Sequence, residues 1–301
     1  MVDLNGMTTE KNNPNSKGFS SLSVSEAVTL MNAEDMNAVR AVSAAHDQIV
    51  KVIEQSKAAL MQGGRIIYTG AGTSGRLGVL DAVECPPTFG VDYNTVIGLI
   101  AGGENAFVKA KEGAEDSAEQ GAADLAAIDL KPVDMVIGIA ASGRTPYALG
   151  ALKYAMELGC PVGAIVCNAH SPIAALCPDT IELLPGPEVL TGSTRLKSGT
   201  ATKMVLNMIS TISMTGLGKI YGNYMVDVKM TNEKLVSRGI GIVQSLTGAD
   251  QAQAVAALKA SDQEVKTAIV MILTDSDADQ ARFLLEKAGG HIEEALRLAK
   301  Q

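Results

Sequence analysis

The sequence predicts an α/β protein: a doubly wound, mostly parallel sheet with helices on both faces, followed by a small C-terminal helical subdomain. Short apolar runs that do not alternate with polar residues are typical of strands buried on both faces of a sheet. Helical stretches separate these runs, and strands that alternate with helices are joined by right-handed crossovers into parallel sheets. The four clear runs cover residues 65–69, 96–100, 135–139 and 162–166.

The first helices precede the sheet. Residues 1–20 are polar and rich in Asn, without the basic and apolar segments of a signal peptide, and we expect them to form a flexible arm. Helical periodicity then runs from about residue 25 to 61 and ends at Gly63-Gly64, a typical helix C-terminus. Between the strands the pattern predicts helices at about 74–84, 115–127 and 145–158, and residues 180–184 are a candidate edge strand.

The C-terminal third changes in character. An apolar helix is expected over 204–217, but polar residues interrupt it and it is too short to span a bilayer. From about residue 247 the pattern becomes short helical pieces separated by glycine and aspartate. The sequence therefore predicts an arm over 1–20, the α/β domain with its N-terminal helices over 21–246, and the helical subdomain over 247–301.

Composition restricts the ligands. The 301 residues carry 25 Lys and Arg against 33 Asp and Glu, with 3% aromatic residues and no Trp. A net charge of −8 and few stacking side chains argue against nucleic acid and anionic membranes as partners. The four cysteines and three histidines lack the spacing of a metal site, so we expect reduced core cysteines, no metal and a cytoplasmic protein.

A glycine-rich turn follows the first predicted strand. Gly70-Ala71-Gly72-Thr73-Ser74-Gly75 matches the G-x-G-x-x-G pattern of dinucleotide-binding proteins. That pattern also needs an acidic residue roughly 20 residues further on to hold a ribose hydroxyl. Here the acidic residue after the next strand, Glu104, lies about 29 residues past Gly75, which fits poorly.

The tripeptide Ser-Gly-Arg occurs twice, at 74–76 and 142–144, each time just after an apolar strand. Hydroxyl groups, backbone N–H groups freed by glycine and a helix N-terminus together suit a phosphate monoester, although tight turns with helix caps remain the alternative. A third hydroxyl-rich stretch, 191–200, is either a substrate-closing segment or a surface loop. The candidate substrate-binding residues of the three stretches are Thr73, Ser74, Arg76, Ser142, Arg144, Thr145, Ser193 and Lys197.

Longer blocks carry a family resemblance. They cover residues 70–78, 81–90, 112–116, 141–147, 191–200, 223–227 and 231–235, and the most specific are Glu-Cys-Pro-Pro at 84–87 and Glu-Gly-Ala-Glu-Asp at 112–116. From about residue 30 to 295 the chain resembles the N-acetylmuramic acid 6-phosphate etherase family, built on a sugar isomerase (SIS-type) domain. That family usually carries Thr-Glu-x-Arg-Asn near its N-terminus, where this chain has Thr9-Glu10-Lys11-Asn12-Asn13.

The resemblance implies a reaction and an assembly. It implies cleavage of the D-lactyl ether of N-acetylmuramic acid 6-phosphate to N-acetylglucosamine 6-phosphate and D-lactate, without metal or organic cofactor, in cell-wall amino-sugar recycling. It also implies a homodimer and a ubiquitin-associated-like fold for the C-terminal helices. Elementary chemistry agrees: in the open-chain sugar the C1 aldehyde acidifies the C2 hydrogen, and the ether oxygen on C3 lies β to that aldehyde. One base and one acid then suffice for elimination, after which water adds.

The resemblance assigns the acid and the base to Glu84 and Glu115. We expect Glu84 to be the acid, because apolar neighbours near a helix end at Pro86-Pro87 would raise its pKa, and Glu115 to be the base. Two other functions stay open. A regulatory SIS-type protein would bind a sugar phosphate without chemistry and would not need paired glutamates, and an aldose-ketose isomerase would move protons between C1 and C2.

Overall fold

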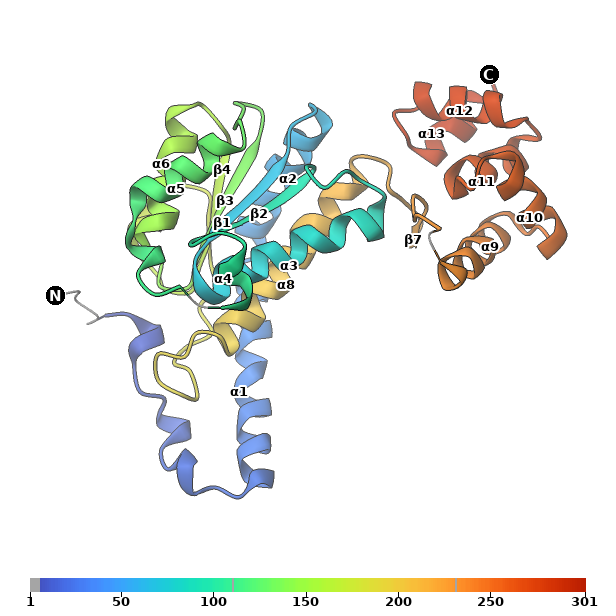
Figure 1. Ribbon diagram of the computed structural model, residues 1–301. Helices are drawn as coiled ribbons and strands as arrows, with labels where there is room; N and C mark the ends of the chain where they lie inside the picture. The colour runs from blue at the N-terminus through green and yellow to red at the C-terminus, as the bar shows by residue number, and fades with distance from the viewer. Residues whose placement is uncertain (1–5, 110, 231) are drawn as a thin grey trace. The chain divides into compact units, whose positions relative to one another are not determined.

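The computed structural model describes residues 6–109, 111–230 and 232–301, drawn in Figure 1. Residues 1–5 of the expected arm and Thr231 of the family blocks lie outside the described residues. The chain forms two compact units, one of Met1–Val83 and Asn94–Thr211, the other of Glu84–Tyr93 and Ile212–Gln301. The chain enters the second unit within each of two long helices, α3 (Gly72–Phe89) and α8 (Lys197–Thr215), and returns to the first unit between Tyr93 and Asn94.

The first unit contains a five-stranded sheet in which every pair of neighbours is parallel, in the order β2-β1-β3-β4-β5. The non-alternating apolar runs and the candidate edge strand are confirmed as strands. β1 and β3 are buried along their whole length, as the absence of alternation predicts. The strands are β1 (Ile66–Gly70), β2 (Val96–Ile100), β3 (Met135–Ala140), β4 (Val162–Val166) and β5 (Thr180–Glu182).

Helices cover both faces of this sheet, which confirms the doubly wound fold. A Cβ on Gly138 of β3 would lie 2.8 Å from the side chain of Leu152 in α6, whereas a Cβ on Gly78 of α3 would lie 3.2 Å from Ile139. Consecutive residues of β3 therefore face helices on opposite sides. Figure 1 shows α5 beside α6 on its face of the sheet. The helices of this unit are α1 (Val24–Ala44), α2 (His46–Met61), α4 (Asn105–Val108), α5 (Ala118–Ala127), α6 (Pro146–Glu157) and α7 (Pro172–Leu176).

The second unit is helical apart from a small hairpin of β6 (Ile220–Tyr221) and β7 (Tyr224–Met225). Its core joins α9 to the later helices, because Ile242 and Val243 pack in the same cluster as Ala268 and Ile269. The helical unit therefore begins before residue 247, where the sequence pattern changes. Its helices are α9 (Glu233–Thr247), α10 (Gln251–Ala260), α11 (Val265–Thr274), α12 (Ala278–Lys287) and α13 (Ile292–Leu298).

The N-terminal segment is folded against the first unit. Within residues 6–21 three short 3₁₀ turns occur, at Thr8–Glu10, Pro14–Ser16 and Phe19–Ser21. Thr9 and Asn13 are buried although both are polar. The expected flexible arm is thus anchored over its described part, because its polar side chains bind inside the protein. No helix among the described residues is long and apolar enough to cross a membrane.

Candidate active site

The two glycine turns follow neighbouring strands. β1 and β3 pair in parallel, with Gly70 opposite Ile139, so the turns after them leave the same edge of the sheet. The chain runs from β1 to β2 on one side and returns to β3 on the other, which makes this edge the topological switch point where open α/β sheets bind ligands. The two Ser-Gly-Arg turns therefore follow neighbouring parallel strands at the same end of the sheet.

The first turn depends on glycine for a close backbone approach. A Cβ on Gly75 would lie 2.6 Å from the carbonyl oxygen of Gly70, and a Cβ on Gly70 would lie 2.7 Å from that of Ile139. Gly72 has a φ of +53°, which favours glycine. Thr73 and Ser74 are half-buried in the first turn of α3, so their hydroxyl groups accompany a helix N-terminus that attracts anions.

A small pocket of about 190 Å³ lies beside this turn. Gly72 and Arg76 line it from the first turn, and residues 111–115 line it from the segment after α4. Glu115 therefore shares a pocket with the predicted phosphate-binding turn, presented by a single 3₁₀ turn (Ala114–Asp116) after Gly113, whose φ is +74°. The Arg76 guanidinium donates to the carbonyl oxygens of Ala106 at 2.7 Å and Phe107 at 2.9 Å, so Arg76 also holds the end of α4 beside the pocket.

The second turn places two hydroxyl groups before α6. The Ser142 Oγ accepts from the Arg144 backbone N–H at 3.3 Å and lies 3.5 Å from the Thr145 Oγ1. Gly143, at a φ of +69°, passes so close to Ser171 that a Cβ would lie 2.3 Å from its side chain. The Arg144 side chain is half-buried. This turn therefore has the hydroxyl groups and the helix N-terminus that the sequence predicts for a phosphate site.

The third stretch lies beside the first turn. A Cβ on Gly199 would be 3.7 Å from the Thr73 methyl carbon, so the start of α8 borders the N-terminus of α3. Ser193 is half-buried in the segment that precedes α8. The 191–200 stretch therefore borders the predicted phosphate-binding turn.

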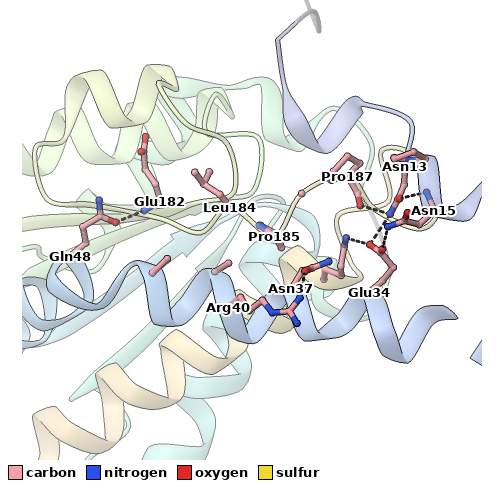
Figure 2. A pocket seen from close by; sticks show the side chains of 15 residues that line it. Asn13, Asn15, Glu34, Asn37, Arg40, Gln48, Glu182, Leu184, Pro185 and Pro187 are labelled. Atoms are coloured by element: carbon pink, nitrogen blue, oxygen red, sulfur yellow. Dashed lines mark hydrogen bonds and ion pairs between the residues drawn. The ribbon is translucent and has the colours of Figure 1, made fainter. Parts of the chain in front are cut away.

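The position of the Lys197 side chain differs from the one that the sequence led us to expect. We predicted that it binds substrate, but its side chain is 1% exposed and its Nζ donates to Glu34 Oε2 at 2.6 Å. Burial opposes the charge on Glu34, yet hydrogen bonds from Lys197, Asn15 and Asn13 outweigh it and lower the pKa of Glu34 to about 2. The ammonium of Lys197 therefore serves a buried ion pair. In Figure 2 the Glu34 carboxylate faces both Asn13 and Asn15, at a pocket of about 630 Å³.

Glu84 lies on α3, in the second unit. Its side chain is exposed, so the apolar enclosure that we expected around it is not formed by the described residues. α3 does not end at Pro86-Pro87 but continues to Phe89. Directly after it, a Cβ on Gly90 would lie 2.3 Å from the Asp227 carbonyl oxygen, so the helix end is packed tightly.

Asp227 itself is held by two cations. Its Oδ2 accepts from Lys219 at 2.7 Å and from Lys266 at 2.9 Å. Burial lowers the pKa of Lys266, and the charge of Asp227 opposes that shift. This cluster stabilises the backbone against which the end of α3 packs.

No group of three or more His, Cys, Asp or Glu side chains within the described ranges is placed to hold a metal ion. All four cysteines are buried, and none of them forms a disulfide with another described residue.

Comparison with known proteins identifies the family. Residues 47–156 match the glucokinase regulatory protein N-terminal SIS domain, and residues 222–266 match the C-terminal lid domain of the same protein. A protein of Serratia proteamaculans (strain 568) named N-acetylmuramic acid 6-phosphate etherase is 54% identical over 295 residues, 98% of this chain and 99% of its own. One of the same name from Francisella tularensis subsp. holarctica (strain LVS) is 53% identical, over 96% of this chain and 98% of its own.

The chain belongs to the N-acetylmuramic acid 6-phosphate etherase family. The resemblance read from the sequence is thereby confirmed, as is the SIS-type domain. Among solved structures, the phosphoheptose isomerase of Neisseria gonorrhoeae is 18% identical, with a TM-score of 0.49 over 64% of this chain and 100% of its own.

Sequence reasoning missed three buried polar residues of this etherase-family chain. Thr9, Glu34 and Asn168 lie in hydrogen-bond networks behind the predicted binding loops. The sequence gives a weak indication of Asn168, because a polar residue two positions after a buried strand lies at the end of the sheet that binds ligands. The sequence gives no indication that Glu34 is buried, since a lone glutamate in an amphipathic helix is ordinarily solvated.

Proposed function

We propose that this chain is a carbon-oxygen lyase that cleaves the D-lactyl ether of N-acetylmuramic acid 6-phosphate to N-acetylglucosamine 6-phosphate and D-lactate. The observation that carries this is the 54% identity to a named etherase over 98% of the chain. The geometry of the first unit supports it, because Glu115 and the first glycine turn line one pocket. The product sugar phosphate re-enters cell-wall amino-sugar metabolism.

The phosphate site comes first in the mechanism. The N-terminus of α3 with Thr73 and Ser74, and that of α6 with Ser142 and Thr145, supply N–H and hydroxyl donors at one sheet edge. A phosphate monoester held there fixes one end of the open-chain sugar. We assign Arg144 and Ser193 to the same binding surface.

The elimination then needs one base and one acid. Glu115 takes the C2 proton, and the electron pair is delocalised into the C1 aldehyde. The C3–oxygen bond breaks while Glu84 gives its proton to the leaving lactate oxygen, which leaves a C2–C3 double bond conjugated with the aldehyde. Water then adds its oxygen to C3 and a proton returns to C2, which yields N-acetylglucosamine 6-phosphate.

The assembly that we propose is a homodimer. α1 exposes an apolar stripe of Val24, Val28, Met36 and Val39, and these positions fall on one side of a helix. An exposed stripe of this kind is typical of a protein contact, and two-fold dimers are the commonest closed assembly. Sedimentation at micromolar concentration should give twice the chain mass of 31.2 kDa, and a monomer there would contradict the proposal.

The compartment that we propose is the cytoplasm. Four buried cysteines that form no disulfide among the described residues suit a reducing compartment better than an oxidising one.

The alternative function is a non-catalytic regulatory protein that binds sugar phosphates, and the match to a glucokinase regulatory protein domain favours this alternative. One experiment separates it from the etherase. The purified chain is incubated with N-acetylmuramic acid 6-phosphate, and D-lactate and N-acetylglucosamine 6-phosphate are measured. The etherase releases both in equal amounts. Binding without lactate would indicate the regulatory protein, and a change at C1 and C2 without lactate would indicate an isomerase.

A further inference from the structure

The N-terminal segment makes buried contacts that the reaction does not explain. The Thr9 backbone N–H donates to Asn168 Oδ1 at 3.2 Å, and Asn168 Nδ2 donates back to Thr9 Oγ1 at 3.0 Å. Both residues are almost fully buried. The two residues thus satisfy each other's polar groups where water does not reach, which fixes the segment to the end of β4.

This pair extends to the other loops at the same sheet edge. Asn168 Nδ2 also donates to the carbonyl oxygen of Ala141 at 3.0 Å, and Ala141 directly precedes Ser142 of the second glycine turn. The Thr9 carbonyl oxygen accepts from the Gly192 N–H at 3.2 Å, at the start of the 191–200 stretch. Thr9 is therefore bonded directly to the segments after β4 and β5, and through Asn168 to the turn after β3.

A second anchor lies a few residues further along. Asn13 Nδ2 donates to Glu34 Oε2 at 2.8 Å and to the Pro187 carbonyl oxygen at 3.0 Å. Glu34 in turn accepts from Lys197, the first residue of α8. Figure 2 shows Asn13 between Glu34 and Pro187. Asn13 therefore ties the segment to the chain that leads from β5 into α8.

We propose that residues 7–16 form a strap that positions the phosphosugar-binding loops, with Thr9 and Asn168 as positioning residues. The proposal rests on the proposed function, since it takes Ser142 and the 191–200 stretch to bind the substrate. The strap acts on these loops from behind, through Ala141 and Gly192, and not on the reacting atoms. Loosening it therefore weakens substrate binding, which raises KM, and leaves the chemical step and kcat nearly unchanged.

The test uses three substitutions at neighbouring threonines in the full chain. Thr9→Val keeps the shape of the side chain and removes its hydroxyl group, Thr9→Ser keeps the hydroxyl group, and Thr8→Val is the matched control outside the buried pair. Lactate release gives kcat and KM for each variant. We expect Thr9→Val to raise KM on the order of 10-fold, the scale of one lost buried hydrogen bond, with kcat within about twofold of wild type. Thr9→Ser and Thr8→Val should resemble wild type.

A second readout does not depend on turnover. Hydrogen exchange followed by mass spectrometry should show faster exchange of the amides of residues 141–147 and 191–200 in Thr9→Val than in Thr9→Ser. Thr9→Ala, which removes the same hydroxyl group, replaces Thr9→Val if that variant does not fold. An unchanged KM together with unchanged exchange would overturn the strap, and so would equal effects of Thr9→Val and Thr8→Val. A wild-type protein that releases no lactate would overturn the proposed function instead. The hydrogen-exchange experiment would still show whether the strap holds residues 141–147 and 191–200 in place.

Discussion

Replacing Lys197 with methionine removes the ammonium group that faces Glu34 at 2.6 Å and keeps an unbranched side chain. The two side chains are 1% and 8% exposed, so the carboxylate left behind is buried without its cation. Breaking such a pair costs about 3–5 kcal/mol. The pKa of Glu34 gives a second value for this free-energy cost. A fall in pKa from 4.5 to about 2 corresponds to about 3 kcal/mol, at 1.36 kcal/mol per pKa unit. Because Asn13 and Asn15 still donate to Glu34, we expect a loss of about 3 kcal/mol.

The assay is urea unfolding at pH 7, followed by circular dichroism and by hydrogen exchange of peptides from the first unit. The pKa of Glu34 is lower in the folded chain, so its contribution is complete above about pH 4.5 and is lost as the pH falls toward 2. The difference between wild type and Lys197→Met should therefore shrink in acid. Lys197→Met combined with Glu34→Gln should lose less stability than Lys197→Met alone, because no charge is left unpaired.

Two results would refute this reasoning. A urea midpoint of Lys197→Met equal to that of wild type would show that the ion pair contributes nothing to the stability of the folded chain. Unchanged stability with a selective loss of phosphate-monoester binding would show that Lys197 binds substrate after all.

Two further predictions concern single side chains. Burial raises the pKa of Asp81 to about 6 in spite of hydrogen bonds with Tyr68 and Ser210, so the folded chain holds this proton more tightly than the unfolded chain. As the pH rises from roughly 4 to 6, the free energy of unfolding should therefore fall by about 3 kcal/mol through this group. Asp81→Asn should lack that part of the fall. Equal slopes of melting temperature against pH in wild type and Asp81→Asn would contradict the prediction. Ser142→Ala should weaken the binding of N-acetylglucosamine 6-phosphate by about 1–3 kcal/mol in calorimetry, and unchanged affinity would remove Ser142 from the site.

The sheet and its ligand edge were predictable because their signals are local. Residues 135–139 have no polar alternation, and β3 is buried on both faces. The glycines of the first turn precede a helix, and each closes a backbone approach that a Cβ would block. Strand-helix alternation then required parallel strands, which brought the two Ser-Gly-Arg turns to one edge.

The features that the sequence did not predict depend on contacts between residues that are distant in sequence. Lys197 looks like a phosphate ligand in its hydroxyl-rich stretch, but its partner Glu34 lies 163 positions earlier. Thr9 looks like part of a flexible arm, and its partner Asn168 is 159 positions away. Helix α9 likewise joins the C-terminal core through Ile242 and Val243, which local periodicity does not connect to any particular partner. Pairings of this kind follow from the tertiary fold and leave no local pattern.

The central claim is that the chain performs an elimination with Glu115 as base and Glu84 as acid, and C2 hydrogen exchange tests it most directly. N-acetylmuramic acid 6-phosphate is incubated in heavy water with wild type, Glu115→Gln or Glu84→Gln, and deuterium at C2 and released lactate are both measured. Glu115→Gln should lose both signals on the order of 10²–10⁴-fold, whereas Glu84→Gln should lose lactate release by a similar factor and retain exchange, because the carbanion still forms and is reprotonated. Exchange that survives in Glu115→Gln and vanishes in Glu84→Gln would reverse the two roles. Wild-type rates of both signals in both variants would contradict the carboxylate-pair mechanism itself.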